Sequence, residues 1–177
     1  AGAISAYYVY GLGLVSKILQ DGSTAYYHCD ARGSTVAMTD ANENITRAYA
    51  YSPYGRVIHQ SGDTPNPFTY LGQHGVMDDD GNGLYYIRAR YYDPADGRFI
   101  TKDKKSGDSR NTQSLNRYVY ALNNPVYLID ISGFSAMEGT VDGNLLYSSD
   151  KTHNSFMKNL FTRENLKHSL KETGYFT

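Results

Sequence analysis

Tryptophan is absent from this chain of 177 residues, and cysteine occurs once, as Cys29. A single thiol excludes an internal disulfide framework and a cysteine-based zinc site. No uninterrupted apolar run approaches the roughly 18 residues that a membrane-spanning helix needs. The start of the sequence lacks a basic region ahead of its apolar residues. If the protein is exported, we expect that its secretion signal lies upstream of Ala1 or has been removed.

Charge of one sign is also lacking, because 17 lysines and arginines face 18 aspartates and glutamates. This balance gives no reason to expect nucleic acid or insertion into an anionic membrane. The histidines show no metal-ligand spacing, so we expect neither a metal nor a cofactor. They are His28, His59, His74, His153 and His168.

Tyrosine, in contrast, is abundant, with 18 residues. It marks a unit in which a tyrosine is followed six residues later by a glycine. The glycines lie 20, 22 and 42 residues apart, and a weaker copy at Tyr70 and Gly75 falls near the midpoint of the long interval, which indicates about five tandem copies. We expect these glycines to occupy turns with backbone angles that a β-carbon resists. The units are Tyr7/Gly13, Tyr27/Gly33, Tyr49/Gly55 and Tyr91/Gly97.

Each unit puts a turn glycine before a β-favouring run, which predicts a mainly β fold of tandem hairpins forming a strip or partial shell. Residues 61–67, with two prolines, are expected to form a surface loop. We expect Phe68–Leu71 to pair with one strand over Leu84–Tyr92, through a turn at Asp78–Gly83. These elements predict a core domain over residues 1–134.

Residues 135–177 form a different kind of segment, a C-terminal extension with apolar residues at helical spacing. One or two short helices are expected there. This tail is too short to build a large core of its own, and it contains no recognisable catalytic constellation. The apolar residues are Phe156, Met157, Leu160, Phe161, Leu166 and Leu170.

Several stretches between residues 7 and 134 resemble, in order, the Rhs repeat-associated core domain of YD-repeat proteins. The resemblance is carried by Tyr27–Asp40, Tyr49–Gly55, Gly83–Pro94, Gly97–Ile100 and Asn116–Gly133, which includes Asn123, Asn124 and Pro125. It implies a hairpin strip that spirals into a hollow shell, which the core domain closes at one end. In polymorphic toxins and insecticidal toxin complexes this shell encloses a C-terminal effector, whereas teneurins use a related shell on animal cells. Secretion or a cell-surface location is therefore expected.

The resemblance also implies self-cleavage by two aspartates in Asp-Pro-x-Gly motifs. The matching residues are Asp103 and Asp130, with the scissile bond at Phe134-Ser135. Two carboxylates at one site can divide the roles of acid and base. Lys104 and Ile131 replace both prolines, which loosens the placement of the carboxylates. The expectation is slow or absent cleavage, with both aspartates serving as turn residues.

Two further patterns each have two readings. Asp78, Asp80, Asn82 and Gly83 match half of a calcium loop, but Ala89 stands where a bidentate glutamate belongs, so a hairpin turn is favoured. Arg88 and Arg90, on one strand with Tyr86 and Tyr92, could bind single-stranded nucleic acid. Packing of these arginines on tyrosines, with ion pairs to Asp93 or Asp96, is favoured instead.

These observations lead to a structural module that closes an Rhs shell and holds its own C-terminal segment. Its expected partners are that segment and either the rest of a shell or copies of the chain. The alternative is a self-assembling extracellular fibre or surface subunit, because open sheet edges favour edge-to-edge pairing. Enzymatic activity would be at most self-cleavage.

Overall fold

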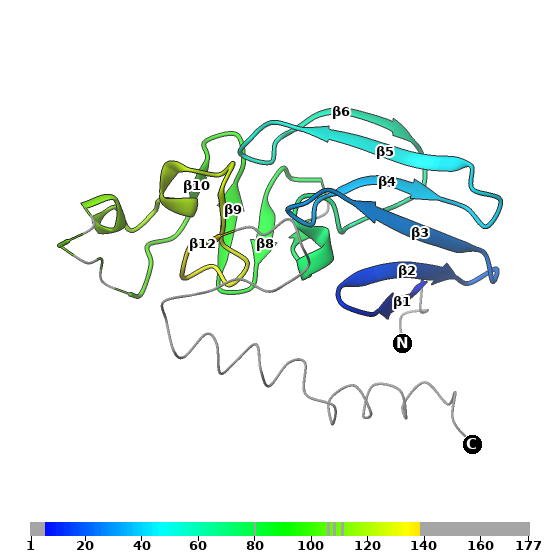
Figure 1. The fold of residues 1–177 in the computed structure, drawn as a ribbon, viewed down its shortest axis with the longest axis horizontal. Helices are drawn as coiled ribbons and strands as arrows, with labels where there is room; N and C mark the ends of the chain where they lie inside the picture. The colour runs from blue at the N-terminus through cyan, green and yellow to red at the C-terminus, as the bar shows by residue number, and fades with distance from the viewer. Residues whose placement is uncertain (1–5, 80, 106, 108, 111, 139–177) are drawn as a thin grey trace, which may run out of the picture. The chain divides into compact units, whose positions relative to one another are not determined.

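The computed structural model describes residues 6–138, apart from 80, 106, 108 and 111. Its first half is a six-stranded antiparallel sheet in which each strand pairs with the next along the chain (Figure 1). The predicted hairpin strip is therefore confirmed. The strands are β1 (Ala6–Tyr10), β2 (Leu14–Leu19), β3 (Thr24–Cys29), β4 (Thr35–Thr39), β5 (Ile45–Tyr51) and β6 (Val57–Gly62).

One turn type recurs between these strands. In each of four turns, the first residue donates its N–H to the carbonyl of the fifth and accepts the N–H of the fourth at its own carbonyl. Asp30 and Asp40 also accept backbone N–H groups through Oδ1, at 2.8 to 2.9 Å. Such Asx-type bonds fix a turn locally. The turns are Leu19–Ser23, Asp30–Ser34, Asp40–Asn44 and Ser52–Arg56.

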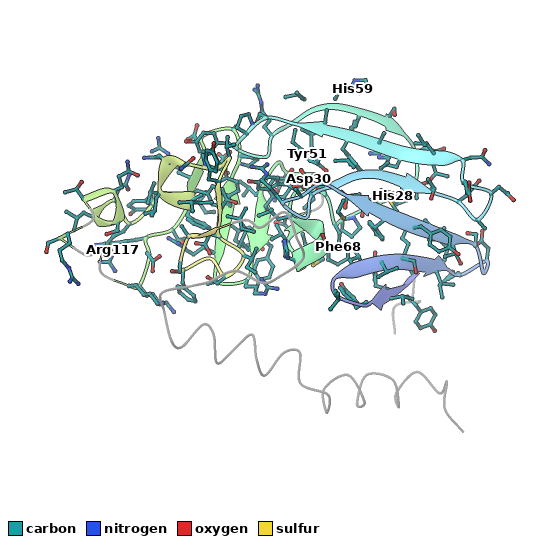
Figure 2. All side chains as sticks on the ribbon, in the orientation of Figure 1. His28, Asp30, Tyr51, His59, Phe68 and Arg117 are labelled. Atoms are coloured by element: carbon teal, nitrogen blue, oxygen red, sulfur yellow. The ribbon has the colours of Figure 1, made fainter. Side chains whose placement is uncertain are left out.

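Residues 63–67 form a strap that crosses from β6 to the covered face of the sheet. Pro65 accepts a hydrogen bond from Lys17 on β2, and Asn66 accepts one from Tyr27 on β3. Phe68, at the end of the strap, packs into a buried cluster with side chains of β2, β3 and β4 (Figure 2). The cluster consists of Leu14, Ala25, Tyr27, Met38 and Phe68.

A second sheet has the order β10-β9-β8-β7 and differs from the expectation. Leu84–Tyr92 is not one strand, because the chain reverses at Arg88 and Ala89, and Ile87 pairs with Arg90. Phe68–Leu71 is not a strand either, and the 3-10 helix η1 (Gly72–His74) follows it. The strands are β7 (Met77–Asp78), β8 (Tyr85–Ile87), β9 (Arg90–Asp93) and β10 (Arg98–Phe99).

Tyrosine rings join the two sheets. Tyr70 is fully buried, and its ring centroid lies 6.1 Å from that of Tyr51 on β5 and 5.5 Å from that of Tyr85 on β8. Tyr70 Oη lies 3.1 Å from Tyr120 Oη, so the hydroxyls form a hydrogen bond inside the core. Figure 2 places Tyr51 at the end of β5 nearest the second sheet. Stacked and hydrogen-bonded tyrosines from both halves of the described chain thus meet in one buried core.

The remaining described chain contains short elements. The 3-10 helices η2 (Thr112–Leu115) and η3 (Ala121–Asn123) precede strands β11 (Leu128–Ile129) and β12 (Met137–Glu138), which pair with each other. The helices expected in the C-terminal extension lie outside the described residues. None of the described helices is long and apolar enough to cross a membrane.

Candidate functional site

Arg90, the first residue of β9, is the centre of a buried charged cluster. Its Nη2 lies 2.9 Å from Asp103 Oδ2 and 3.7 Å from Asp130 Oδ2. Its Nε donates to the Gly133 carbonyl, and its Nη1 donates to the Arg117 carbonyl at 3.0 Å. The guanidinium carbon lies 3.6 Å from the centroid of the Phe99 ring. A single side chain therefore joins four segments that are far apart in the sequence.

Both aspartates use their second oxygen to form turns. Asp103 Oδ1 accepts the Lys105 N–H at 2.7 Å. Asp130 Oδ1 accepts the N–H groups of Ser132 and Gly133 at 3.1 and 2.8 Å. Each aspartate thus directs Oδ1 to its own turn and Oδ2 to Arg90.

The two carboxyl groups differ in their environment. Asp130 is 2% exposed, and burial raises its pKa because removal from water penalises the charged form. Hydrogen bonds from Ser132 and the Gly133 backbone oppose that shift. The Asp103 side chain is 12% exposed and lies closer to Arg90 than the Asp130 side chain does. Asp130 is therefore the more deeply buried of the two carboxyl groups, and Asp103 is the one in direct contact with the guanidinium.

The Phe134-Ser135 bond lies beside Asp130. Asp130 Oδ1 accepts the Phe134 N–H at 3.3 Å, and its carboxyl group also interacts with the Ser135 backbone. Strand β12 begins two residues after Ser135 and pairs with β11, which ends directly before Asp130. The chain on both sides of this bond is thus held at the carboxylate cluster.

The four repeat glycines each face a side chain from another part of the chain. Gly33, Gly55 and Gly97 have φ of 87°, 89° and 67°, whereas Gly13 is not among the residues with positive φ. A β-carbon on any of the four would meet a neighbouring side chain at 2.4 to 2.8 Å. The neighbours are Gln73 for Gly13, His74 for Gly33, Tyr70 for Gly55 and Tyr54 for Gly97.

The Asn123-Asn124-Pro125 block connects η3 to β11. Asn123 has φ of 57°, and Asn124 accepts the Leu128 N–H at 2.9 Å. Arg32 donates to the carbonyl of Pro125 and, at 3.2 Å, to that of Pro53. The block is therefore anchored to the turn that contains Asp30, rather than to the carboxylate cluster.

The role of Arg90 was missed by the sequence reasoning, which paired this residue with Asp93 or Asp96. Because the chain turns at Arg88 and Ala89, the two arginines do not form a ladder along one strand. Arg88 instead donates to the carbonyls of Ile131 and His74. Two features of the sequence could have identified Arg90. It is a basic residue in a tyrosine-rich segment that is buried, and the same chain has two isolated Asp-x-x-Gly-like motifs.

The acidic turn after β7 forms a hairpin. Asp78 pairs with Tyr85 across β7 and β8, and Asn82 Oδ1 accepts the Leu84 N–H at 2.8 Å. Gly81 and Gly83 both have positive φ. Within the described part of the chain, no group of three or more His, Cys, Asp or Glu side chains could hold a metal ion.

A meander of hairpins with Asx-type turns, followed by a core sheet around a buried arginine and two aspartates, defines a segment of a YD-repeat shell. The family described as "Teneurin YD-shell" matches residues 3–126, and the chain therefore belongs to the YD-shell family.

Three relatives illustrate the similarity. The tRNA3(Ser)-specific nuclease WapA of Bacillus spizizenii is 31% identical over 130 residues, which cover 71% of this chain and 5% of that protein. YibJ of Escherichia coli K12 is 36% identical over 131 residues, or 72% of this chain and 49% of that protein. A solved structure of the Photorhabdus luminescens Tc holotoxin pore has a TM-score of 0.60 at 24% identity, covering 73% of this chain and 6% of that one. The chain thus spans a small part of the length of most of these relatives.

Proposed function

We propose that this chain is the structural module that ends a YD shell and retains the segment following it. The observation that carries the proposal is Arg90, which ties β9 to Asp103, Arg117, Asp130 and Gly133. The pairing of β12 with β11 holds residues beyond Phe134 to the same body. If the chain were cut after Phe134, these hydrogen bonds would keep the new end in place.

The partner in this proposal is the remainder of a shell. Strands β1 and β6 are the outer strands of the six-stranded sheet, and each exposes apolar side chains. Tyr7 is 59% and Ile58 is 60% exposed. Unpaired strand edges of this kind can pair with further strands. The relatives named above are much longer proteins than this chain.

Copies of the same chain are the alternative partner, which would give a fibre or surface layer. Light scattering and electron microscopy of the purified chain separate the two cases. The shell proposal expects short-lived or no self-association. It also expects a closed particle only when upstream repeats are joined to the chain. Long regular fibres of the chain alone would support the alternative instead.

Self-cleavage at Phe134-Ser135 is a second candidate function. It is supported by the convergence of both carboxylates on Arg90 and by the contact of Asp130 with the backbone at that bond. In this reaction Asp130 would donate a proton to the peptide carbonyl, and Asp103 would serve as the base that activates water. Lys104 and Ile131 in place of proline leave the motifs less rigid, so we expect a slow reaction and a mostly continuous chain.

Intact mass spectrometry over time tests this candidate. If fragments meeting at Phe134 and Ser135 accumulate, Asp103→Asn and Asp130→Asn should each abolish them, while Asp96→Asn on the exposed β9–β10 turn should not. Wild-type rates in both site variants would remove the aspartyl mechanism. Co-elution of the fragments in gel filtration would separately support retention of the C-terminal segment.

We further propose that the chain acts outside the cell or on its surface, without nucleic acid and without insertion into a membrane. Support comes from a relative named salivary gland surface protein 1 of Aedes aegypti, which is 37% identical over 113 residues, or 61% of this chain and 3% of that protein. Antibody labelling of intact producing cells and of their medium tests the location. Retention of all protein in the cell interior would contradict it.

A further inference from the structure

Lys17 is a buried amine in the middle of the six-stranded sheet. Its side chain is on the covered face of β2, and the residue is only 2% exposed. Lysine is almost never fully buried unless it is paired, yet within the described residues no carboxylate forms an ion pair with it. Its Nζ donates to the carbonyl of Pro65 in the strap. Burial lowers the pKa of Lys17, which favours the neutral and nucleophilic form of the amine.

Asn66 is the next residue of the strap, one peptide unit from that contact. Its Oδ1 accepts two hydrogen bonds, from Tyr27 Oη at 3.0 Å and from the Phe68 N–H at 3.0 Å. Its Nδ2 donates to the Phe68 carbonyl at 2.9 Å. Two donors directed at one carbonyl oxygen polarise the carbon and stabilise the oxyanion that forms when a nucleophile attacks it.

The surroundings are apolar. Lys17 pairs across the sheet with Tyr8 and with Ala25, which is 5% exposed. The Tyr8 ring contacts Phe68 edge to face, with centroids 5.0 Å apart. Burial also raises the pKa of Tyr27, so its hydroxyl remains a proton donor at neutral pH. The sheet side of the contact is therefore buried, whereas Pro65 is exposed and Asn66 is half-buried.

We propose that Lys17 and Asn66 become joined by an intramolecular isopeptide bond, which forms without any external enzyme. The Nζ lone pair attacks Cγ of Asn66 while Tyr27 and the Phe68 N–H stabilise the oxygen. One Nζ proton passes to Nδ2. The Cγ–Nδ2 bond then breaks, ammonia leaves, and an amide joins Nζ to Cγ. No oxidant, reductant or other reactant is needed.

This bond would fasten the strap to β2 at the end of the sheet where β1 lies at the edge. It goes beyond the proposed shell role and does not depend on it. An isolated strip of hairpins has little core of its own, and a covalent clamp would compensate for this at the place where the first three strands meet the strap.

The experiment is an intact mass measurement on the full folded chain, followed by peptide mapping. We expect a mass below that of the sequence by one ammonia molecule, and a cross-linked peptide that contains both Lys17 and Asn66. The Lys17→Arg and Asn66→Ala variants should each have the mass calculated from the variant's own sequence, without the loss of ammonia. The exposed residues Lys102 and Asn44 provide controls, because Lys102→Arg and Asn44→Ala should keep the cross-link.

Tyr27→Phe separates the chemistry from packing, since it keeps the ring and removes the donor. Loss of one such donor should slow bond formation about 10²-fold. A folded wild-type chain, as judged by circular dichroism, that keeps its full sequence mass after long incubation at neutral pH would overturn the proposal. A cross-link at the wild-type rate in Tyr27→Phe would overturn the assigned role of the hydroxyl.

Discussion

In both the six-stranded sheet and the β7–β10 sheet the extended chain reverses direction, but the turns that reverse it differ between the two sheets. In the first, positive φ falls mostly on glycines in short turns, and Glu43 at 65° is the exception. In the second and the loops around it, positive φ falls also on residues with side chains. These are Leu71, Arg88, Ala121, Leu122 and Asn123, with φ between 44° and 57°.

The difference shows where the energy for each turn comes from. A left-handed backbone costs most residues with a β-carbon about 1–2 kcal/mol, and Ala121 and Leu122 of η3 each bear that cost, whereas Asn123 adopts this conformation more readily. Tyr120 directly before them and Ala121 among them are 0% and 2% exposed. Packing in the aromatic core therefore maintains these turns, whereas the turns of the first sheet are stable through local hydrogen bonds.

Among the substitutions that test this difference between the sheets, removal of the Arg90 side chain should lower the free energy of unfolding most. Arg90→Ala leaves Asp103 and Asp130 without their shared cation, and breaking a buried pair in this way costs about 3–5 kcal/mol of unfolding free energy. Urea denaturation measures it. Arg98→Ala, at an exposed position of β10, is the matched control and should change stability by less than about 0.5 kcal/mol. Equal effects of the two substitutions would show that the cluster does not stabilise the second sheet.

A β-carbon at Gly55 should have the next largest effect, because this glycine lies in a turn of the first sheet that contacts the second sheet. It has φ of 89°, and a β-carbon would lie 2.6 Å from the Tyr70 ring. Gly55→Ala should cost about 2–4 kcal/mol through backbone strain and overpacking. Gly22 has φ of 81°, but a β-carbon there would meet no atom within 4 Å. Gly22→Ala should therefore cost only about 1 kcal/mol. Thermal unfolding midpoints that match would mean that the ring of Tyr70 moves aside freely.

Acid should weaken the junction between the sheets through His74. Its Nε2 donates to the Arg32 carbonyl at 3.0 Å, its own carbonyl accepts from Arg88, and burial lowers its pKa. Since the folded pKa is below the unfolded value of about 6.5, the stabilisation is complete above that pH and is lost as the pH falls from there through the lower folded pKa. Each unit of lowering corresponds to about 1.4 kcal/mol.

Urea midpoints at pH 8 and pH 5 test this linkage. Asp30 and Arg88 act on the ring with opposite sign and are unchanged in His74→Gln, which keeps a hydrogen-bond donor. This variant should lose less stability between the two pH values than the wild type. An equal loss in both proteins would assign the pH dependence to other groups.

Glu43→Gly should give the smallest effect, and it should be stabilising. Glu43 occupies the fourth position of its turn, and Gly33 and Gly55 occupy the same position in other turns of this type. Relief of the left-handed strain should add up to about 1 kcal/mol, partly offset by the greater freedom of glycine in the unfolded chain. Calorimetry showing a lower midpoint for this variant would contradict the view that the local turn type sets the cost.

The strand and turn pattern of the first sheet was predictable because its determinants are close in sequence. Asp30 and Gly33 lie in one turn, and the strands beside it are stabilised by that turn. The hairpin at Arg88 was not predictable, since Arg88-Ala89 is not a turn sequence. It forms because Arg88 donates to Ile131 and His74, which are 43 and 14 residues away.

The candidate site divides in the same way. Similarity to a known family marked Asp103 and Asp130 as a pair, and local chemistry marked both as turn formers. Neither argument identified Arg90 as the group between them, because its ligands come from segments that only the folded core brings together.

The sequence by itself determined that this protein is a tyrosine-rich meander with glycine and Asx turns, because those preferences act within five residues. Only the tertiary structure decided where the second sheet turns, how Lys17 meets the strap, and which cation lies between the two aspartates. These features depend on burial, which removes water from charged and strained groups and makes each of them stable only when distant parts of the chain supply its partners.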